Sequence, residues 1–144
     1  MILADEEATA ALGARLASIA GPGDVIALSG PLGVGKTALA RGFIAALGHE
    51  GEVPSPSFSI VQPYDDLDPP VWHVDLFRVE DPRELDELGL DSATEAILLV
   101  EWPERAGSAA WPNVLRLTLD VIDPSSRSLT ANVPAAWEGR WPFP

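Results

Sequence analysis

Hydrophobic and polar residues recur along this chain with the two periods that distinguish helices from strands. Residues 5–20 place apolar side chains at helical spacing behind an Asp5 N-cap, and residues 38–47 repeat that spacing. A shorter helix is predicted between Asp81 and Gly89, since proline follows the first of these and glycine often ends a helix. Strands are predicted where residues alternate or are apolar throughout, at 25–28, 59–64, 71–77, 96–100, 114–120 and 129–133.

The most apolar of these strands, at residues 96–100, has the composition of a strand covered on both faces of a sheet. Residues 114–120 alternate instead, which predicts a half-exposed and most simply antiparallel strand, with residues 129–133 as its hairpin partner. A chain of 144 residues with helices between its strands indicates one α/β domain. We assign residues 1–136 to this domain, because the tail at 137–144 shows no clear period.

A glycine-rich stretch joins the first strand to the second helix. From Gly30 to Thr37 it fits G-x-x-x-x-G-K-[S/T], the phosphate-binding P-loop. In this motif, backbone N–H groups and the positive end of the helix dipole surround the phosphates. Lys36 would reach the β- and γ-phosphates of a nucleoside triphosphate, and the Thr37 hydroxyl would ligate Mg²⁺. The expected nucleotide-binding residues of this segment are Gly33, Val34, Gly35, Lys36, Thr37 and Ala38.

The alternative is an ordinary glycine-rich turn, and two observations weigh against it. The stretch has a strand before it and a helix after it, which is the context that the phosphate-binding motif requires. Lys36 is also the only lysine in the chain, and the bulkier, forked arginine substitutes poorly for a compact ammonium between two phosphates. We therefore expect nucleoside triphosphate binding.

Hydrolysis or phosphoryl transfer needs further groups, and two acids at predicted strands are candidates. Glu101 directly follows an apolar strand, and we expect it to hold Mg²⁺ directly or through water. Asp75 lies within another strand, from which it would position or deprotonate the attacking water. The alternatives are a solvated Glu101 and a salt bridge between Asp75 and Arg78.

A proline-rich loop follows the second helix and contains two serines. Ser55 and Ser57 would sense the γ-phosphate and Mg²⁺, as ordered switch segments do. The alternative is a connector whose serines satisfy only backbone groups. His73 is interpreted as a strand histidine with a local hydrogen bond. Arg41, like Arg78, is a candidate charge stabiliser.

The net charge of −13 limits the classes of partner. With 22 acidic and 9 basic side chains, the chain lacks the basic face that tight nucleic-acid binding requires. The acidic surface is either a solvated exterior or a docking face for a basic partner protein. The chain has no cysteine, no apolar run long enough to cross a membrane and no signal-peptide pattern at its N-terminus. We therefore expect a cytoplasmic location.

Taken together, these motifs resemble the TsaE (YjeE) family of bacterial ATPases, which serve the threonylcarbamoyladenosine modification of tRNA. The resemblance covers about residues 5–104. Besides the P-loop, it rests on R-G-F at 41–43, S-P-S-F at 55–58, H-V-D-L-F-R at 73–78 and V-E-W-P at 100–103. It implies a compact P-loop fold with a mixed parallel and antiparallel sheet flanked by helices.

The resemblance also implies ATP and Mg²⁺ as ligands, and slow hydrolysis that depends on the partner proteins TsaB and TsaD. It makes Lys36, Asp75 and Glu101 the catalytic residues, with Thr37 and Glu101 at the metal. Ser57 stands where the family usually has threonine, and Thr9 matches a family position near the nucleotide. Two further departures are Phe77 in place of the usual tyrosine and Pro31 in place of a common acid; neither changes the expected catalytic or metal residues.

Three other functions share the P-loop. A small-molecule kinase would need an acceptor pocket and a lid, for which 144 residues leave little room. A GTPase commonly selects guanine with an N-K-x-D motif, which this chain cannot contain because Lys36 is its sole lysine. A nucleotide-sensing module would bind ATP without useful turnover, and differs from an ATPase only in whether hydrolysis is needed.

Overall fold

A computed structural model of the chain describes residues 1–56, 59–90, 94–107, 111 and 113–141. Ser57, part of the predicted switch loop, lies outside these residues. The helical segments are α1 (Glu6–Ala17), α2 (Lys36–Ala46), the 3₁₀ helices η1 (Pro82–Leu88) and η3 (Pro103–Ala106), and α3 (Ala135–Glu138). The strands are β1 (Ile2–Leu3), β2 (Val25–Ser29), β3 (Val61–Tyr64), β4 (Val71–Asp75), β5 (Ile97–Glu101), β6 (Leu115–Val121) and β7 (Arg127–Asn132).

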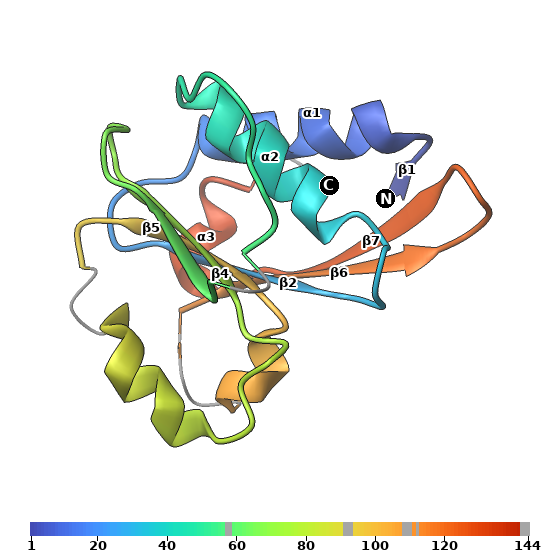
Figure 1. Cartoon of the computed structure of the whole chain (residues 1–144). Coiled ribbons are helices and arrows are strands. Elements are labelled where there is room, and N and C mark those ends of the chain that lie inside the picture. Colours follow the sequence, from blue (N-terminus) through green and yellow to red (C-terminus); the bar gives the residue numbers. More distant parts are fainter. Residues whose placement is uncertain (57–58, 91–93, 108–110, 112, 142–144) are drawn as a thin grey trace.

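The strands of the described chain form one seven-stranded sheet in the order β1-β7-β6-β2-β5-β4-β3 (Figure 1). β2 pairs in parallel with β5 and β6, and β5 pairs in parallel with β4. The outer pairs β3–β4, β6–β7 and β1–β7 are antiparallel. The predicted α/β fold with a mixed sheet is therefore confirmed. The expectation for residues 114–120 is only partly correct, because β6 is antiparallel to β7 but parallel to β2.

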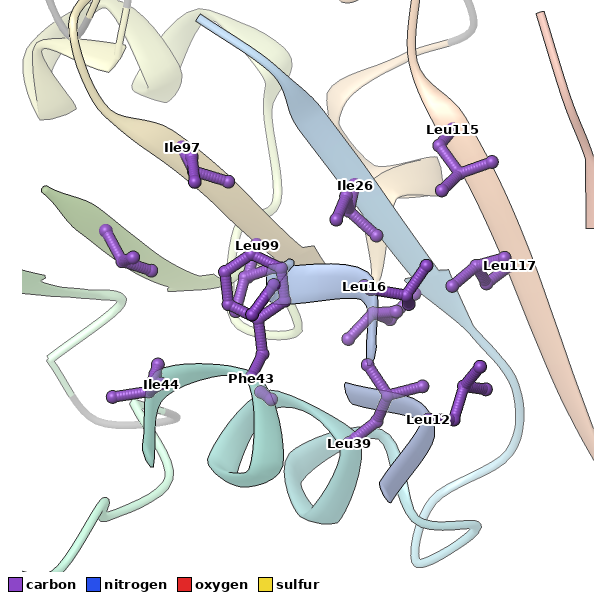
Figure 2. Packing of buried hydrophobic residues seen from close by; sticks show 14 of the residues in the cluster. Leu12, Leu16, Ile26, Leu39, Phe43, Ile44, Ile97, Leu99, Leu115 and Leu117 are labelled. Carbon is purple, nitrogen blue, oxygen red and sulfur yellow. The ribbon is translucent and has the colours of Figure 1, made fainter. Parts of the chain in front are cut away.

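Two apolar clusters cover the two faces of this sheet. Along β5 the side chains alternate between them: Ile97 and Leu99 belong to the larger cluster, and Leu98 and Val100 to the smaller. Because both faces of β5 are covered, the strand is buried throughout, as its apolar composition predicts. Figure 2 shows the larger cluster, in which residues of α1 and α2 such as Leu16, Leu39 and Phe43 point toward the sheet.

The register of the parallel strands brings three chain segments to one edge of the sheet. Glu101, the last residue of β5, pairs with Leu28 of β2 on one side and with Asp75 of β4 on the other. The P-loop begins at Gly30, directly after β2. Both acids therefore end their strands beside the P-loop, where α/β sheets commonly bind ligands.

Residues 135–141 join the core, although the sequence from residue 137 shows no clear period. Trp137 in α3 is completely buried in the larger cluster. Arg140 lies over the Trp137 ring, 4.0 Å from its centroid, and forms an ion pair of 2.5 Å with Asp24. Trp137 packs in the core, and the ion pair attaches Arg140 to the turn before β2. No helix in the described ranges has the length and apolar character needed to span a bilayer.

Helices α1 and α2 pack at close range because each has a glycine at the contact. A methyl group on Gly42 of α2 would overlap the carbonyl oxygen of Ala10, and one on Gly13 of α1 would overlap that of Leu39. The backbones of the two helices therefore touch directly, which fixes α2, and with it the P-loop, against α1.

We predict that Gly42→Ala lowers the free energy of unfolding by about 1–3 kcal/mol. Alanine favours helix by about 1 kcal/mol over glycine, but its Cβ would force the two helices apart. Gly139→Ala is the matched control, since nothing lies within 4 Å of a methyl group placed there. Urea denaturation of both variants measures the difference, and equal stabilities would contradict the close packing.

Candidate functional site

The P-loop leaves β2 and enters α2 through backbone that only glycine adopts readily. Gly35 is the N-cap of α2 with a φ of 116°, and no side chain caps the helix. Gly30 has a φ of 143°, and a methyl group there would overlap the carbonyl oxygen of Leu119. The amides at the start of α2 are therefore not capped by a side chain and point toward the space that a phosphate would occupy.

Lys36, the first residue of α2, is only 4% exposed. Its Nζ donates a hydrogen bond of 2.7 Å to the Gly30 carbonyl oxygen and lies 3.6 Å from the centroid of the Trp102 ring. Burial lowers the pKa of Lys36, while the nearby carboxylates of Glu101, Glu104 and Asp75 oppose that shift. The ammonium is thus enclosed by a carbonyl group and an aromatic face, both of which favour a cation.

Glu101 is 2% exposed and is held from two sides. The Thr37 hydroxyl lies 3.2 Å and 3.3 Å from its two carboxylate oxygens, and His73 Nε2 lies 2.6 Å from Oε2. The alternative of a solvated Glu101 is therefore wrong. The expected hydrogen bond of His73 exists, but its partner is this carboxylate on the neighbouring strand and not a local group.

Asp75 is the last residue of β4 and is 5% exposed. Its Oδ1 accepts a hydrogen bond of 2.9 Å from the Phe77 backbone N–H. Burial raises the pKa of Asp75; the Phe77 hydrogen bond opposes this shift, and the charge of Glu101 adds to it. A carboxylate with raised proton affinity beside a phosphate-binding loop is suited to general-base chemistry.

Most of the predicted residues line one cavity of about 300 Å³. Its lining brings together Gly33, Gly35, Lys36, Thr37, Ala38, Asp75 and Glu101, together with Ser55 and Arg41. The Arg41 guanidinium is held here by a hydrogen bond of 2.8 Å from its Nε to the Val53 carbonyl oxygen.

The remaining predicted nucleotide-binding residues that the structure describes are Thr9 and Val34, which line a second cavity of about 370 Å³. The two cavities share Glu6, Gly33, Gly35 and Ala38, so they adjoin each other at the P-loop. Thr9 is 1% exposed and lies against the loop, since a methyl group on Gly35 would be 3.7 Å from its Cγ2. The described residues of the predicted nucleotide, metal and catalytic sets therefore lie around the P-loop, whereas Arg78, the other candidate charge stabiliser, lines neither cavity.

The sequence alone did not identify two residues of this site. Trp102 follows Glu101 with a φ of 58°, and its ring contacts Lys36 and lies 4.9 Å from that of Phe77. Arg127 of β7 donates from Nε to the Val34 carbonyl oxygen at 2.9 Å, and so attaches the β6–β7 hairpin to the P-loop. Trp102 is adjacent to a predicted residue, which is a usable signal, but Arg127 follows from tertiary structure alone.

Comparison with known proteins identifies the family. A sequence model of the family described as threonylcarbamoyl adenosine biosynthesis protein TsaE matches residues 3–129, which is most of the chain. The chain belongs to the TsaE family. The resemblance inferred from the motif series is therefore confirmed, and the match extends beyond residues 5–104 into β7.

Individual TsaE relatives agree with this result. The protein named tRNA threonylcarbamoyladenosine biosynthesis protein TsaE in Rickettsia felis is 34% identical over 129 residues, which are 88% of this chain and 75% of that protein. Its namesake in Streptomyces coelicolor is 41% identical over 113 residues, 76% of each chain. The crystal structure of Bacillus subtilis YdiB matches with a TM-score of 0.80 at 30% identity, covering 96% of this chain and 88% of that one.

We predict that Asp75→Asn stabilises this TsaE-family protein at neutral pH, by up to about 1 kcal/mol. Because the folded pKa of Asp75 is raised, the folded state disfavours its charge, and this penalty is complete above the folded pKa. The penalty disappears as the pH falls below the ordinary value of 3.8, so the gain from asparagine should shrink toward acid.

Asp123→Asn is the control of opposite sign. Hydrogen bonds from Ser126 and Ser125 lower the pKa of Asp123 to about 2, so its charge favours folding and asparagine should destabilise the protein at neutral pH. Urea titrations of both variants between about pH 3 and pH 8 provide the comparison, because this interval includes the ordinary carboxyl pKa of about 4. A pH-independent effect of Asp75→Asn would contradict the raised pKa.

Proposed function

We propose that this protein binds ATP with Mg²⁺ and hydrolyses it slowly, in support of the threonylcarbamoyladenosine modification of tRNA. The observation that carries the proposal is the convergence of Lys36, Thr37, Asp75 and Glu101 on one cavity at the carboxyl edge of the parallel strands. An ammonium, a hydroxyl and two buried carboxylates around a P-loop are the groups that phosphoryl chemistry requires.

The oxygen donors at α2 and β5 fit Mg²⁺. The Thr37 hydroxyl donates a hydrogen bond to Glu101, which leaves the lone pairs of its oxygen available to a cation, and Glu101 adds a carboxylate. No group of three or more His, Cys, Asp or Glu in the described ranges would hold a metal by itself. Mg²⁺ in phosphoryl-transfer sites uses one or two protein ligands and takes the rest from phosphates and water. When bound, it would neutralise charge on the phosphates.

Each remaining residue then has a role in the proposed reaction. Lys36 would exchange its bond to the Gly30 carbonyl for the β- and γ-phosphate oxygens. Asp75 would orient the attacking water and accept its proton, a role supported by its burial and raised pKa. Ser57 remains a candidate switch hydroxyl on the loop that follows α2.

The second cavity is the proposed site of the nucleoside. It adjoins the P-loop and is lined by Thr9 and Ser125, among others. The guanidinium of Arg127 is fixed there by hydrogen bonds to the carbonyl oxygens of Val34, Asp123 and Ser126. A planar group held in this way offers a flat surface on which a purine ring can stack.

The rim of the first cavity supports the proposed dependence on TsaB and TsaD. Leu32 and Phe77, two apolar residues of its lining, are 78% and 41% exposed. Water must be excluded for the electrostatic interactions of the site to reach full strength, and a partner covering this rim would exclude it. The net charge of −13 supports leaving tRNA contact to the partners.

We predict that Lys36→Ala weakens ATP binding about 100-fold or more, because two or more charge-assisted bonds to phosphate are lost. Isothermal titration with ATP and Mg²⁺ measures the affinity. Arg83→Ala is the control, since it removes the same charge from a side chain that is 88% exposed. Unchanged affinity in Lys36→Ala would refute the proposed P-loop chemistry.

We predict that Glu101→Gln keeps ATP affinity within about 10-fold but lowers the hydrolysis rate at least about 100-fold in the presence of TsaB and TsaD. The amide keeps the shape of the side chain and removes the charge. Phosphate release without any acceptor is the measurement, and it also distinguishes hydrolysis from kinase activity. Glu104→Gln is the control, because Glu104 is exposed and does not line the cavity. Equal rates in Glu101→Gln and the wild type would argue for a binding module without useful turnover.

A further inference from the structure

His73 is a buried histidine for which the proposed hydrolysis has no direct use. The side chains of residues 71, 73 and 75 of β4 lie on one face of the sheet. The larger apolar cluster covers this face, because Val71 belongs to that cluster. On β5 the same face carries Leu99, the partner of His73, and then Glu101, the partner of Asp75. His73 is therefore diagonal to Glu101 across the two strands, and it is completely buried.

The hydrogen bonding of His73 is unequal at its two ring nitrogens. Nε2 lies 2.6 Å from Glu101 Oε2, and the tautomer that donates from Nε2 is the one that pairs with a carboxylate acceptor. Nδ1 has no hydrogen-bond partner in the described part of the chain. An unpartnered buried nitrogen is unfavourable, and an apolar side chain of similar size would avoid that cost. The only polar contact that the structure shows for this ring within the described residues is the one to Glu101.

That contact determines where the carboxylate points. Oε2 of Glu101 receives His73 from β4, and both carboxylate oxygens are within reach of the Thr37 hydroxyl on α2. Two donors from two different elements thus hold one carboxylate at the start of α2. With the His73 bond removed, the only hydrogen bonds that the structure shows to this carboxylate from described side chains are those of Thr37.

We propose that His73 is a positioning residue that holds Glu101 in the orientation required to bind the divalent cation of the nucleotide complex. The inference rests on the proposed function, because it assigns Glu101 to that cation. The inference goes beyond the proposed function, because the affinity for the cation then depends on a residue that contacts neither cation nor nucleotide. Groups that hydrogen-bond metal-ligating carboxylates typically change metal affinity or activity 10–100-fold when removed.

The test compares two side chains of similar length, one with and one without a donor. His73→Met fills the same volume but cannot donate, whereas the amide of His73→Gln can occupy the position of Nε2 and restore the bond. The probe is Mn²⁺ binding to the full-length protein saturated with ADP, measured by electron paramagnetic resonance. We expect about 10–100-fold weaker Mn²⁺ binding in His73→Met and recovery to within about 5-fold of the wild type in His73→Gln. ADP affinity without metal should stay unchanged in both.

Val71→Ala is the matched control for lost packing. Val71 is on the same strand and the same face, two residues earlier, and is equally buried. This variant should lose stability in urea but keep the Mn²⁺ affinity of the wild type. An equal loss of Mn²⁺ affinity in Val71→Ala and His73→Met, or no recovery in His73→Gln, would overturn the positioning role and leave only a structural one.

Glu101→Gln separates failure of this inference from failure of the proposed function. If Glu101→Gln weakens Mn²⁺ binding and His73→Met does not, the role of His73 is refuted and the site assignment stands. If Glu101→Gln leaves Mn²⁺ binding unchanged, the assignment of Glu101 to the cation is wrong and the inference falls with it. Should His73→Met fail to fold, His73→Leu provides the same donor-free comparison with His73→Gln.

Discussion

The rest of this structure depends on one constraint, which is that charged side chains beside the P-loop are buried away from water. Lys36, Asp75 and Glu101 are each no more than 5% exposed, and isolated buried charges are strongly unfavourable. A carbonyl group and an aromatic ring compensate the charge of Lys36, and a backbone amide compensates that of Asp75. Two side-chain donors compensate the charge of Glu101. Trp102, Thr37 and His73 are distant in sequence from the charges that they compensate, so these contacts form only when α2, β4 and β5 have come together.

The register of the parallel strands makes this compensation possible. A shift of β4 by one residue against β5 would turn Asp75 and His73 to the opposite face, where apolar residues lie under η1 and η3. The close contact of α1 and α2 at Gly13 and Gly42 fixes the other side, because it sets the position of the helix that begins at Lys36. Packing on both faces of the sheet therefore controls the chemistry at its edge.

Local signals made much of this predictable from sequence. The P-loop needs only contiguous residues, and an acid directly after an apolar run is visible without a structure; both led to the positions found at Lys36, Thr37 and Glu101. What could not be predicted depends on contacts between strands. The partner of His73 is set by the β4–β5 register, and the buried place of Trp137 by the packing of the whole core. The sequence signals available for the histidine were its period-2 relation to Asp75 and its place in the H-V-D-L-F-R motif.

Nucleotide chemistry at this site is proposed to serve the modification of tRNA. The most direct measurement is reconstituted threonylcarbamoyladenosine formation with TsaB, TsaD and the synthase that makes threonylcarbamoyl-AMP, with this protein added as wild type or as Lys36→Ala. We expect repeated turnover with the wild type and no more than a single round with the variant. Repeated turnover at the same rate when the protein is left out would contradict it.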